Sequence, residues 1–235
     1  PTKMISEEFR MTSADKKYIT FILLFFISTL FSFGVLAVNN NVTVETSYAL
    51  NDNQLKIVEG AKKCLADKFS YDLSMAYHVL TYKDGINTGK KVFPGGDLSP
   101  EIGVCTDVTV RALRYGLDLD LQKEINTDAA NSWKDYPMKR WSAKKPDSNI
   151  DHRRVPNQQV WFEKYWTNVT SDEFMPGDVI IWDMNEDGWS DHIGILSDNK
   201  LNSRYKVIHN FPDPGYVAEE DVINEWKISG VYRIK

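Results

Sequence analysis

The stretch EIGVCTDVTVRALRYG, residues 101–116, combines a helical pattern with one of only two cysteines in the 235-residue chain. Apolar residues recur at helical spacing from Val104 to Leu113, which predicts a helix that begins near Cys105 and ends near Gly116. The apolar side of this helix has to be buried against other elements of the domain. The segments before and after it therefore decide the fold.

Helices are predicted on both sides of this stretch, and strands follow them. Asp52 can cap a helix that runs to about Phe69, and further helices are predicted over residues 119–133 and 155–166. The expected apolar stripe of the first helix consists of Leu55, Val58, Ala61, Leu65 and Phe69. The runs that are typical of strands are residues 75–93, 178–184, 192–198, 205–211 and 228–234. This order predicts an α+β fold, in which N-terminal helices pack on an antiparallel sheet formed by the C-terminal half.

The N-terminal part of the chain indicates export. Residues 18–37 carry no charge and follow Lys16 and Lys17, so they fit a signal peptide cleaved after Ala37. The run is also long enough to span a bilayer once, which leaves an uncleaved single membrane anchor as the alternative. In both interpretations the remainder of the chain lies outside the cytoplasm, in the periplasm or at the cell surface.

The expected organisation is therefore simple. Residues 1–37 are an upstream extension plus the signal peptide or anchor, residues 38–50 are a polar tether, and residues 51–235 form one domain. The net charge is −5 and the sequence has no basic stripe that could neutralise phosphates. This balance argues against nucleic acid as a partner.

A cysteine at the start of a helix has a specific chemical use. The unpaired backbone N–H groups and the positive end of the helix dipole favour the thiolate, which predicts a lowered pKa for Cys105. A nucleophilic thiol also needs a base, and histidine is the usual one. Two of the four histidines, His192 and His209, lie in predicted strands near the C-terminus.

Three other interpretations of these residues remain open at this point. Cys64 and Cys105 can form a disulfide, as two cysteines in an exported protein often do. Cys105, His192 and His209 are also suitable zinc ligands, although none of them forms a local pair at ligand spacing. Either histidine can instead be an ordinary residue of the core.

Five motifs occur in one order, and together they resemble a known bacterial family. They are GVCTDVTVRALR, NIDHRRVPN, MPGDVIIWD, DHIGIL and VIHNF, and the similarity runs from about Tyr71 to Lys235. The family is the one catalogued as domain of unknown function 1287. That family in turn resembles, more loosely, the papain-like NlpC-type cell-wall cysteine peptidases and amidases.

The resemblance implies a papain-like fold and a set of catalytic residues. Cys105 corresponds to the nucleophile, His192 to the base that opens the strand, and His209 to the polar residue that orients the base. Asn210 and Asp191 are alternatives for the third residue, because each lies beside one of the histidines. No cofactor and no metal ion is implied.

Substrate-binding residues are expected in two places. NlpC-type enzymes usually carry an aspartate directly before the cysteine, whereas here the nearest one is Asp107, two residues after it. In NIDHRRVPN, Arg153 and Arg154 can grip a substrate carboxylate as a fork, with Asp151 in the same site. The alternative is an internal ion pair in which Asp151 orders the loop.

These features predict an extracytoplasmic cysteine hydrolase that cleaves amide bonds, with peptidoglycan stem peptides as its substrate. The alternative functions are a non-catalytic module that binds cell-wall peptide in the same groove, and a disulfide-stapled structural or redox protein.

Overall fold

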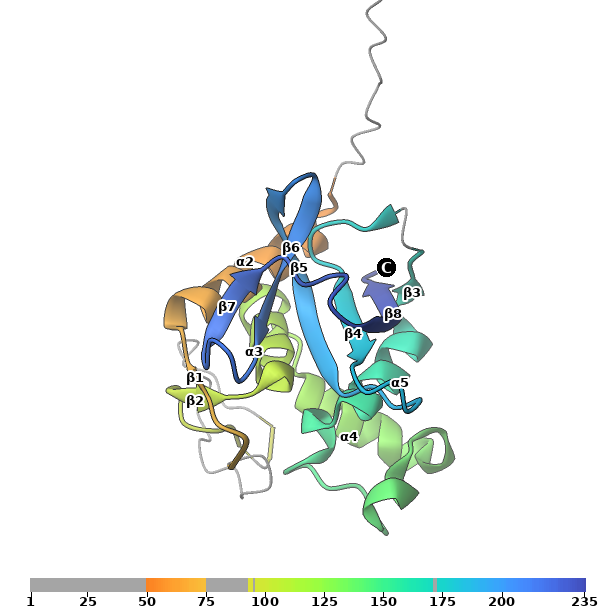
Figure 1. Cartoon of the computed structure of the whole chain (residues 1–235). Helices are drawn as coiled ribbons and strands as arrows, with labels where there is room; N and C mark the ends of the chain where they lie inside the picture. The colour runs from red at the N-terminus through yellow and green to blue at the C-terminus, as the bar shows by residue number, and fades with distance from the viewer. Residues whose placement is uncertain (1–49, 75–92, 95, 171–172) are drawn as a thin grey trace, which may run out of the picture. The chain divides into compact units, whose positions relative to one another are not determined.

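The strands of the C-terminal half pair into one antiparallel sheet with the order β3-β8-β4-β5-β6-β7 (Figure 1). The computed structural model describes residues 50–74, 93–94, 96–170 and 173–235. The sheet strands are β3 (Thr167–Asn168), β4 (Val179–Asp183), β5 (His192–Leu201), β6 (Arg204–Asn210), β7 (Val217–Glu220) and β8 (Lys227–Arg233). A separate parallel pair consists of β1 (Ser70–Tyr71) and β2 (Ile102–Gly103).

The helices come before most of these strands in the chain. They are α2 (Asp52–Asp67), α3 (Cys105–Leu117), α4 (Leu121–Asn131) and α5 (Val155–Tyr165), with short 3-10 turns η2 (Trp133–Asp135), η3 (Met138–Trp141) and η4 (Asp151–Arg153). Helices α2 and α3 pack against each other and against β5. The predicted α+β class, with helices on an antiparallel sheet, is confirmed.

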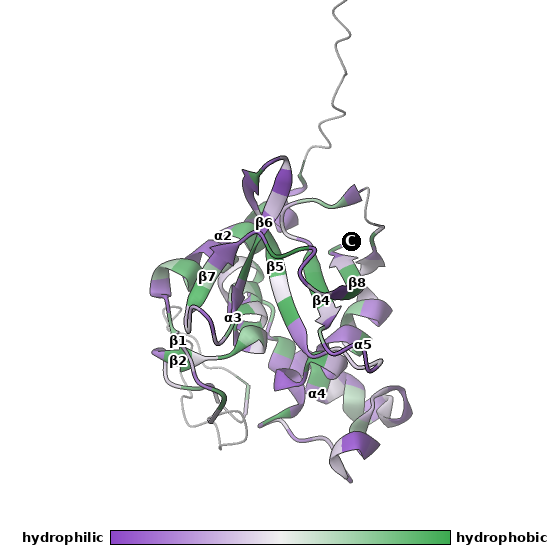
Figure 2. Cartoon of the chain, viewed as in Figure 1, coloured by the Kyte–Doolittle hydropathy of each residue, from purple (hydrophilic) through white to green (hydrophobic). Residues whose placement is uncertain are grey.

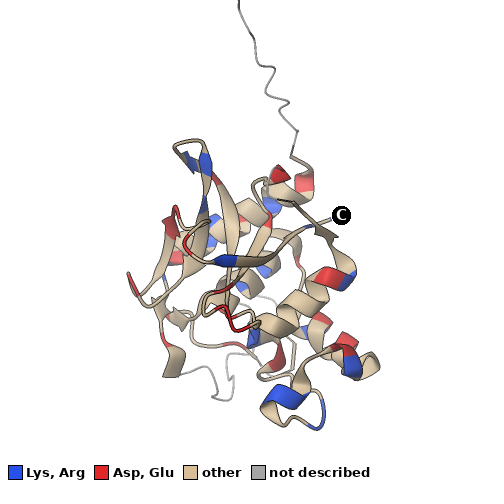
Figure 3. Ribbon diagram, turned by 45° about the vertical axis from the view of Figure 1, so that its right-hand side comes forward, with Lys and Arg blue, Asp and Glu red and all other residues tan. Residues whose placement is uncertain are grey.

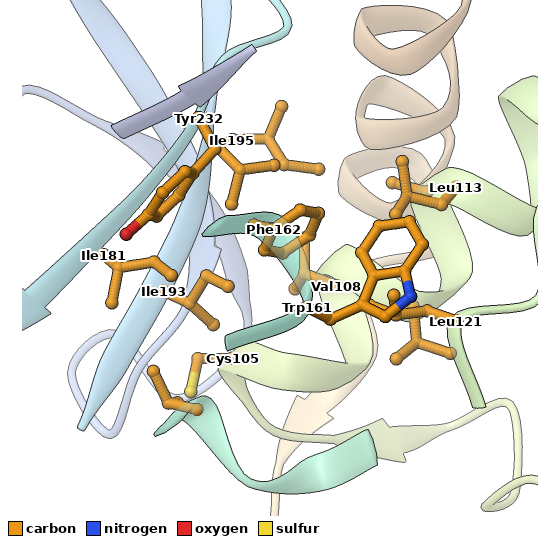
Figure 4. Close-up of a cluster of buried hydrophobic side chains, with 14 of the residues drawn as sticks. Cys105, Val108, Leu113, Leu121, Trp161, Phe162, Ile181, Ile193, Ile195 and Tyr232 are labelled. Carbon is orange, nitrogen blue, oxygen red and sulfur yellow. The ribbon is translucent and has the colours of Figure 1, made fainter. Parts of the chain in front are cut away.

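The alternation of side chains along the strands builds two apolar clusters, one on each face of the sheet. Ile181, Ile193 and Ile195 face the helices and are fully buried with Phe162 of α5 (Figure 4). The second cluster contains neighbouring residues of β4 and β5 together with residues of β6 and β8, namely Ile180, Trp182, Leu196, Val207 and Val231. Because both faces are covered there, all of β4 and the first six residues of β5 are buried, and β4 is mostly apolar (Figure 2).

The prediction for α2 is correct in extent and in most of its buried stripe, since Val58, Ala61 and Phe69 are buried, but it is wrong in its cap and at Leu55. Asn51, not Asp52, is the N-cap, and its side chain accepts a hydrogen bond from the Gln54 backbone N–H. Leu55 is 46% exposed, whereas Cys64 is fully buried. Helix α3 approaches α2 closely at Gly60, where an added Cβ would lie 2.1 Å from the Ala112 carbonyl oxygen.

Strand β7 is absent from the sequence prediction, and two predicted segments lie outside the described residues. These segments are most of the 75–93 hairpin and residues 1–49, which include the predicted signal peptide or anchor. Within the described ranges, no helix is both long and apolar enough to cross a membrane. Charged residues of both signs are spread over the helices and strands (Figure 3).

Candidate active site

Cys105 is the first residue of α3, and buried polar contacts hold this helix start in place. The backbone N–H of Val104 donates to Asp107 Oδ2 at 2.7 Å. The guanidinium of Arg153 binds the same carboxylate with two parallel hydrogen bonds, Nε to Oδ1 at 2.9 Å and Nη2 to Oδ2 at 2.8 Å. The cysteine is therefore presented by a helix end with little freedom to move.

The Cys105 thiol lies at the edge of the core, beside Ile193 (Figure 4). Burial raises the pKa of Cys105 to about 12, and the charge of Asp107 acts in the same direction. Hydrogen bonds from the backbone N–H groups of Ile193 and Thr106 lower the pKa, but by less than burial raises it. The predicted lowering of this pKa is therefore wrong, because desolvation of the sulfur outweighs the backbone hydrogen bonds that the thiol receives.

His192 and His209 are brought together as the sequence predicted. His192 is the first residue of β5, and the next residue, Ile193, contacts Cys105 through its backbone. Nε2 of His192 lies 2.8 Å from Nδ1 of His209 on β6. Burial, followed by the proximity of His209, lowers the pKa of His192 to about 3. Burial also lowers the pKa of His209 to about 4, so both imidazoles are neutral at neutral pH.

Aromatic rings enclose the histidine pair. The Trp182 ring stacks on His192 with a centroid distance of 5.4 Å, and the rings of Phe211 and Trp226 meet His192 edge-on at 5.1 and 5.3 Å. Phe211 also stacks on His209. This packing limits the rotation of both imidazoles and removes water from around them, which explains their lowered pKa values.

A further acidic residue continues the row of hydrogen bonds. Nε2 of His209 lies 3.1 Å from Oε2 of Glu220 on β7. The carboxylate is partly accessible, with 37% of the Glu220 side chain exposed. The sequence analysis missed Glu220 because it missed β7, and no motif in the sequence marks this residue.

The cysteine opens onto a cavity of about 250 Å³ between the helix start and the loops around it. Arg140 and Trp141 of η3 line one part of it, and Tyr71 lines another. Burial and the nearby Cys105 raise the pKa of the Tyr71 hydroxyl group. The cavity thus combines apolar walls with a few polar side chains, as ligand sites commonly do.

The predicted substrate fork of Arg153 and Arg154 is replaced by internal ion pairs. Arg153 is bound to Asp107, and their side chains are only 1% and 2% exposed. Arg154 Nη1 donates to Asp151 Oδ1 at 2.9 Å, and its guanidinium lies 4.2 Å above the Trp141 ring. These contacts favour the alternative of internal ion pairs, because the charged groups of Arg153, Asp107 and Asp151 have protein partners, while Arg153 also lines the cavity. Arg154 holds Asp151 and also lines the cavity.

The two alternatives for the third catalytic residue have other contacts. Asn210 is fully buried and donates through Nδ2 to the carbonyl oxygens of Phe69 and Gly103. Asp191 accepts hydrogen bonds from the Met184 backbone N–H at 3.0 Å and the Asn185 side chain at 2.8 Å. His209 is the residue that contacts His192.

Both cysteines are free thiols, so the predicted alternative of a disulfide between them is wrong. Cys64 is fully buried against the Val108 carbonyl oxygen, and burial raises its pKa. Among the residues that the structure describes, no three His, Cys, Asp or Glu side chains are grouped so that they could hold a metal ion.

Comparison with known proteins places this site within a family. The family model "Domain of unknown function (DUF1287)" matches residues 70–234. The chain belongs to the DUF1287 family. A relative described as "Uncharacterized protein YijF", from Escherichia coli (strain K12), is 38% identical over 187 residues, which is 77% of this chain and 82% of the relative.

Solved structures similar to this DUF1287 protein include an NlpC protein and an amidase. NlpC1 from Trichomonas vaginalis is 15% identical with a TM-score of 0.44, and the match covers 79% of this chain and 45% of that one. An N-acetylmuramoyl-L-alanine amidase from Bacteroides uniformis is 14% identical with a TM-score of 0.43, over 79% of this chain and all of the amidase. The chain spans less than half the length of the NlpC1 structure.

Proposed function

We propose that this protein is an exported, papain-like cysteine hydrolase that cleaves amide bonds, with peptidoglycan stem peptides as its substrate. The observation that carries the proposal is the hydrogen-bonded pair of His192 and His209, together with a Cys105 thiol that lines an open cavity and is hydrogen-bonded by the backbone of Ile193, the residue after His192. A nucleophile at a helix start, a base and a group that orients the base are the parts that acyl transfer requires.

The hydrogen bond to His209 supports a separate role for each nitrogen of His192 in this proposal. Its Nε2 is bound to His209, which leaves Nδ1 as the nitrogen that can take a proton from the thiol. The Cys105 sulfur forms a bond to the substrate carbonyl carbon while the Sγ–H proton passes to Nδ1. The backbone N–H of Cys105, at the start of the helix, can stabilise the developing oxyanion.

The second half of the reaction returns both groups to their resting state. When the tetrahedral intermediate collapses, the carbon–nitrogen bond breaks and the leaving amine takes the proton from His192. Water then attacks the thioester on Cys105 with His192 as the base, releases the carboxylic acid and restores the thiol. In this proposal the proton moves from the thiol to His192 during the attack, because burial raises the pKa of Cys105 and lowers that of His192.

Arg140 is the basic residue of the cavity best suited to a substrate carboxylate. Its guanidinium lies 4.3 Å above the Trp189 ring. Among the described residues, no carboxylate forms an ion pair with it, in contrast to Arg153 and Arg154. A peptide stem carries carboxylates that a planar guanidinium recognises well.

Digestion of purified sacculi with the recombinant protein, followed by mass analysis of the released fragments, tests the proposal. Cys105→Ala and His192→Ala should each abolish release while the folded state persists, and the double variant should be no worse than either. Cys64→Ala is the matched control, because it removes the other buried thiol and should retain activity. Undiminished release by Cys105→Ala would refute the hydrolase.

The burial of the thiol also favours a second function, a non-catalytic module that binds cell-wall peptide, because a neutral cysteine is a weak nucleophile. Binding of stem peptide without any release of fragments, and with equal affinity in Cys105→Ala, would identify this function.

A further inference from the structure

The row of hydrogen bonds from β5 to β7 contains one residue whose hydrogen-bonding role is fixed by its chemistry. An ionised carboxylate can only accept a hydrogen bond, whereas each nitrogen of a neutral imidazole either donates or accepts. Glu220 is therefore the member that sets the direction of the row. His192 and His209 can adopt either tautomer unless a neighbour selects one.

We propose that Glu220 is a positioning residue that selects the reactive tautomer of His192 through His209. The proposal rests on the proposed function for its catalytic consequence. Oε2 of Glu220 lies 3.1 Å from Nε2 of His209, so this nitrogen carries the proton and donates it to the carboxylate. Nδ1 of His209 is then an acceptor, and at 2.8 Å it accepts the hydrogen bond from Nε2–H of His192.

The consequence appears two residues away from the carboxylate. With the proton of His192 held on Nε2, its Nδ1 keeps a free lone pair and can act as the base for Cys105. A donor in place of Glu220 would reverse both bonds and place the proton of His192 on Nδ1. The imidazole would then have no lone pair for the thiol.

The packing around the pair makes this selection effective. His192 and His209 are 2% and 1% exposed, and the rings of Trp182, Phe211 and Trp226 surround His192. Neither imidazole can turn freely, and bulk water cannot exchange their roles. Gly194 contributes to the same fit, because an added Cβ would lie 3.2 Å from Cβ of His209 and 2.5 Å from Cγ1 of Val207.

The neighbouring residue Glu219 provides a matched control. It belongs to the same strand, but its carboxylate accepts hydrogen bonds from Ser197 and from Asn199 Nδ2, not from a histidine. The same substitution at Glu219 and Glu220 changes the net charge equally. A difference between the two variants therefore reports the contact with His209.

Long-range ¹H–¹⁵N spectra of the full-length protein with labelled histidine, recorded at neutral pH, test the tautomers directly. The expected wild-type spectrum has both His192 and His209 protonated on Nε2. In Glu220→Lys, whose ammonium can only donate, both protons should move to Nδ1, whereas Glu219→Lys should match the wild type. A wild-type His209 protonated on Nδ1, or no change in Glu220→Lys, would overturn the proposal.

Kinetics on released wall peptides separate positioning from structure. Glu220→Gln should lower kcat by about 10- to 100-fold, as the loss of a group that orients a functional histidine commonly does, with KM unchanged. Glu220→Asp should recover part of the loss, because it keeps an acceptor. An unchanged kcat in Glu220→Gln would contradict the proposed role.

The tautomer spectra do not depend on turnover, so the two proposals fail separately. The expected tautomers without any hydrolysis would refute the enzyme and keep the selection by Glu220. Hydrolysis with the opposite tautomers would refute the selection and keep the enzyme.

Discussion

The buried ion pair between Asp107 and Arg153 is expected to stabilise the fold and not to recognise substrate. In Arg153→Met the guanidinium is lost while the Asp107 carboxylate remains in a site that is 2% exposed. Removing one partner of a buried pair costs about 3–5 kcal/mol, because the other charge is left without compensation. For a domain of this size, that loss corresponds to a fall in Tm of roughly 6–20 °C.

Thermal and urea unfolding of the full-length protein measure this loss. Asp107→Leu combined with Arg153→Met should recover much of it, because two apolar side chains of suitable volume can replace a buried pair at little cost. Arg204→Met is the control: the Arg204–Asp221 pair has a similar two-pronged geometry but an exposed arginine, so little change is expected.

The pH dependence of the stability also reports the pairing of Asp107 with Arg153. Arg153 is the largest favourable influence on Asp107: it opposes the effect of burial and lowers the pKa of the carboxyl group. A lowered acid pKa stabilises the folded state above its ordinary value of 3.8, and this stabilisation disappears as the pH falls through the folded pKa. A small stability loss in Arg153→Met together with a large rise in KM for carboxylate substrates would refute the structural role.

Three further predictions concern the site. Iodoacetamide should label Cys105 slowly at about pH 6, and the rate should still rise above about pH 8, because burial raises the pKa of this thiol to about 12. Cys64 should be labelled only after unfolding. A labelling midpoint of Cys105 near neutral pH would contradict a neutral thiol in the resting site. Acidification should destabilise the protein, because burial lowers the pKa of His152, His192 and His209 below the unfolded value of 6.5 and the unfolded chain therefore binds more protons between that value and about pH 3 to 4. In denaturant unfolding at a series of pH values, each histidine should lower the free energy of unfolding by about 1.4 kcal/mol per pH unit in this window. A stability that does not depend on pH there would contradict this prediction. Gly194→Ala should lower stability and activity together, because the added methyl group meets Val207 and His209; wild-type values for both would show that the strand can shift at no cost.

Much of the fold follows from local patterns. The apolar periodicity around Cys105 predicted α3, and the β-branched runs predicted β4, β5, β6 and β8 at nearly their observed bounds. These elements are recognisable because each is long and carries a complete period of buried residues. Strand β7 has only four residues, and its pairing with β6 depends on contacts that no local pattern records.

Local patterns also predicted some features of the candidate site and not others. The sequence by itself identified Cys105, His192 and His209, because few side chains supply a nucleophile or a base and their motifs occur in one order. It also indicated that Arg153 and Asp151 belong to one charged loop, but not which partner each would take. The partner of Arg153 is Asp107, which lies 46 positions away in the sequence and binds it only in the folded structure.

What only the tertiary structure decided are the quantities that depend on surroundings. The pKa of Cys105 rises because the core removes water from the sulfur, an effect larger than that of the backbone hydrogen bonds to the thiol. The contact of His209 with Glu220 exists because β7 pairs beside β6. A sequence specifies which groups are present, whereas desolvation and the direction of a hydrogen bond are properties of the packed environment, and no local pattern contains them.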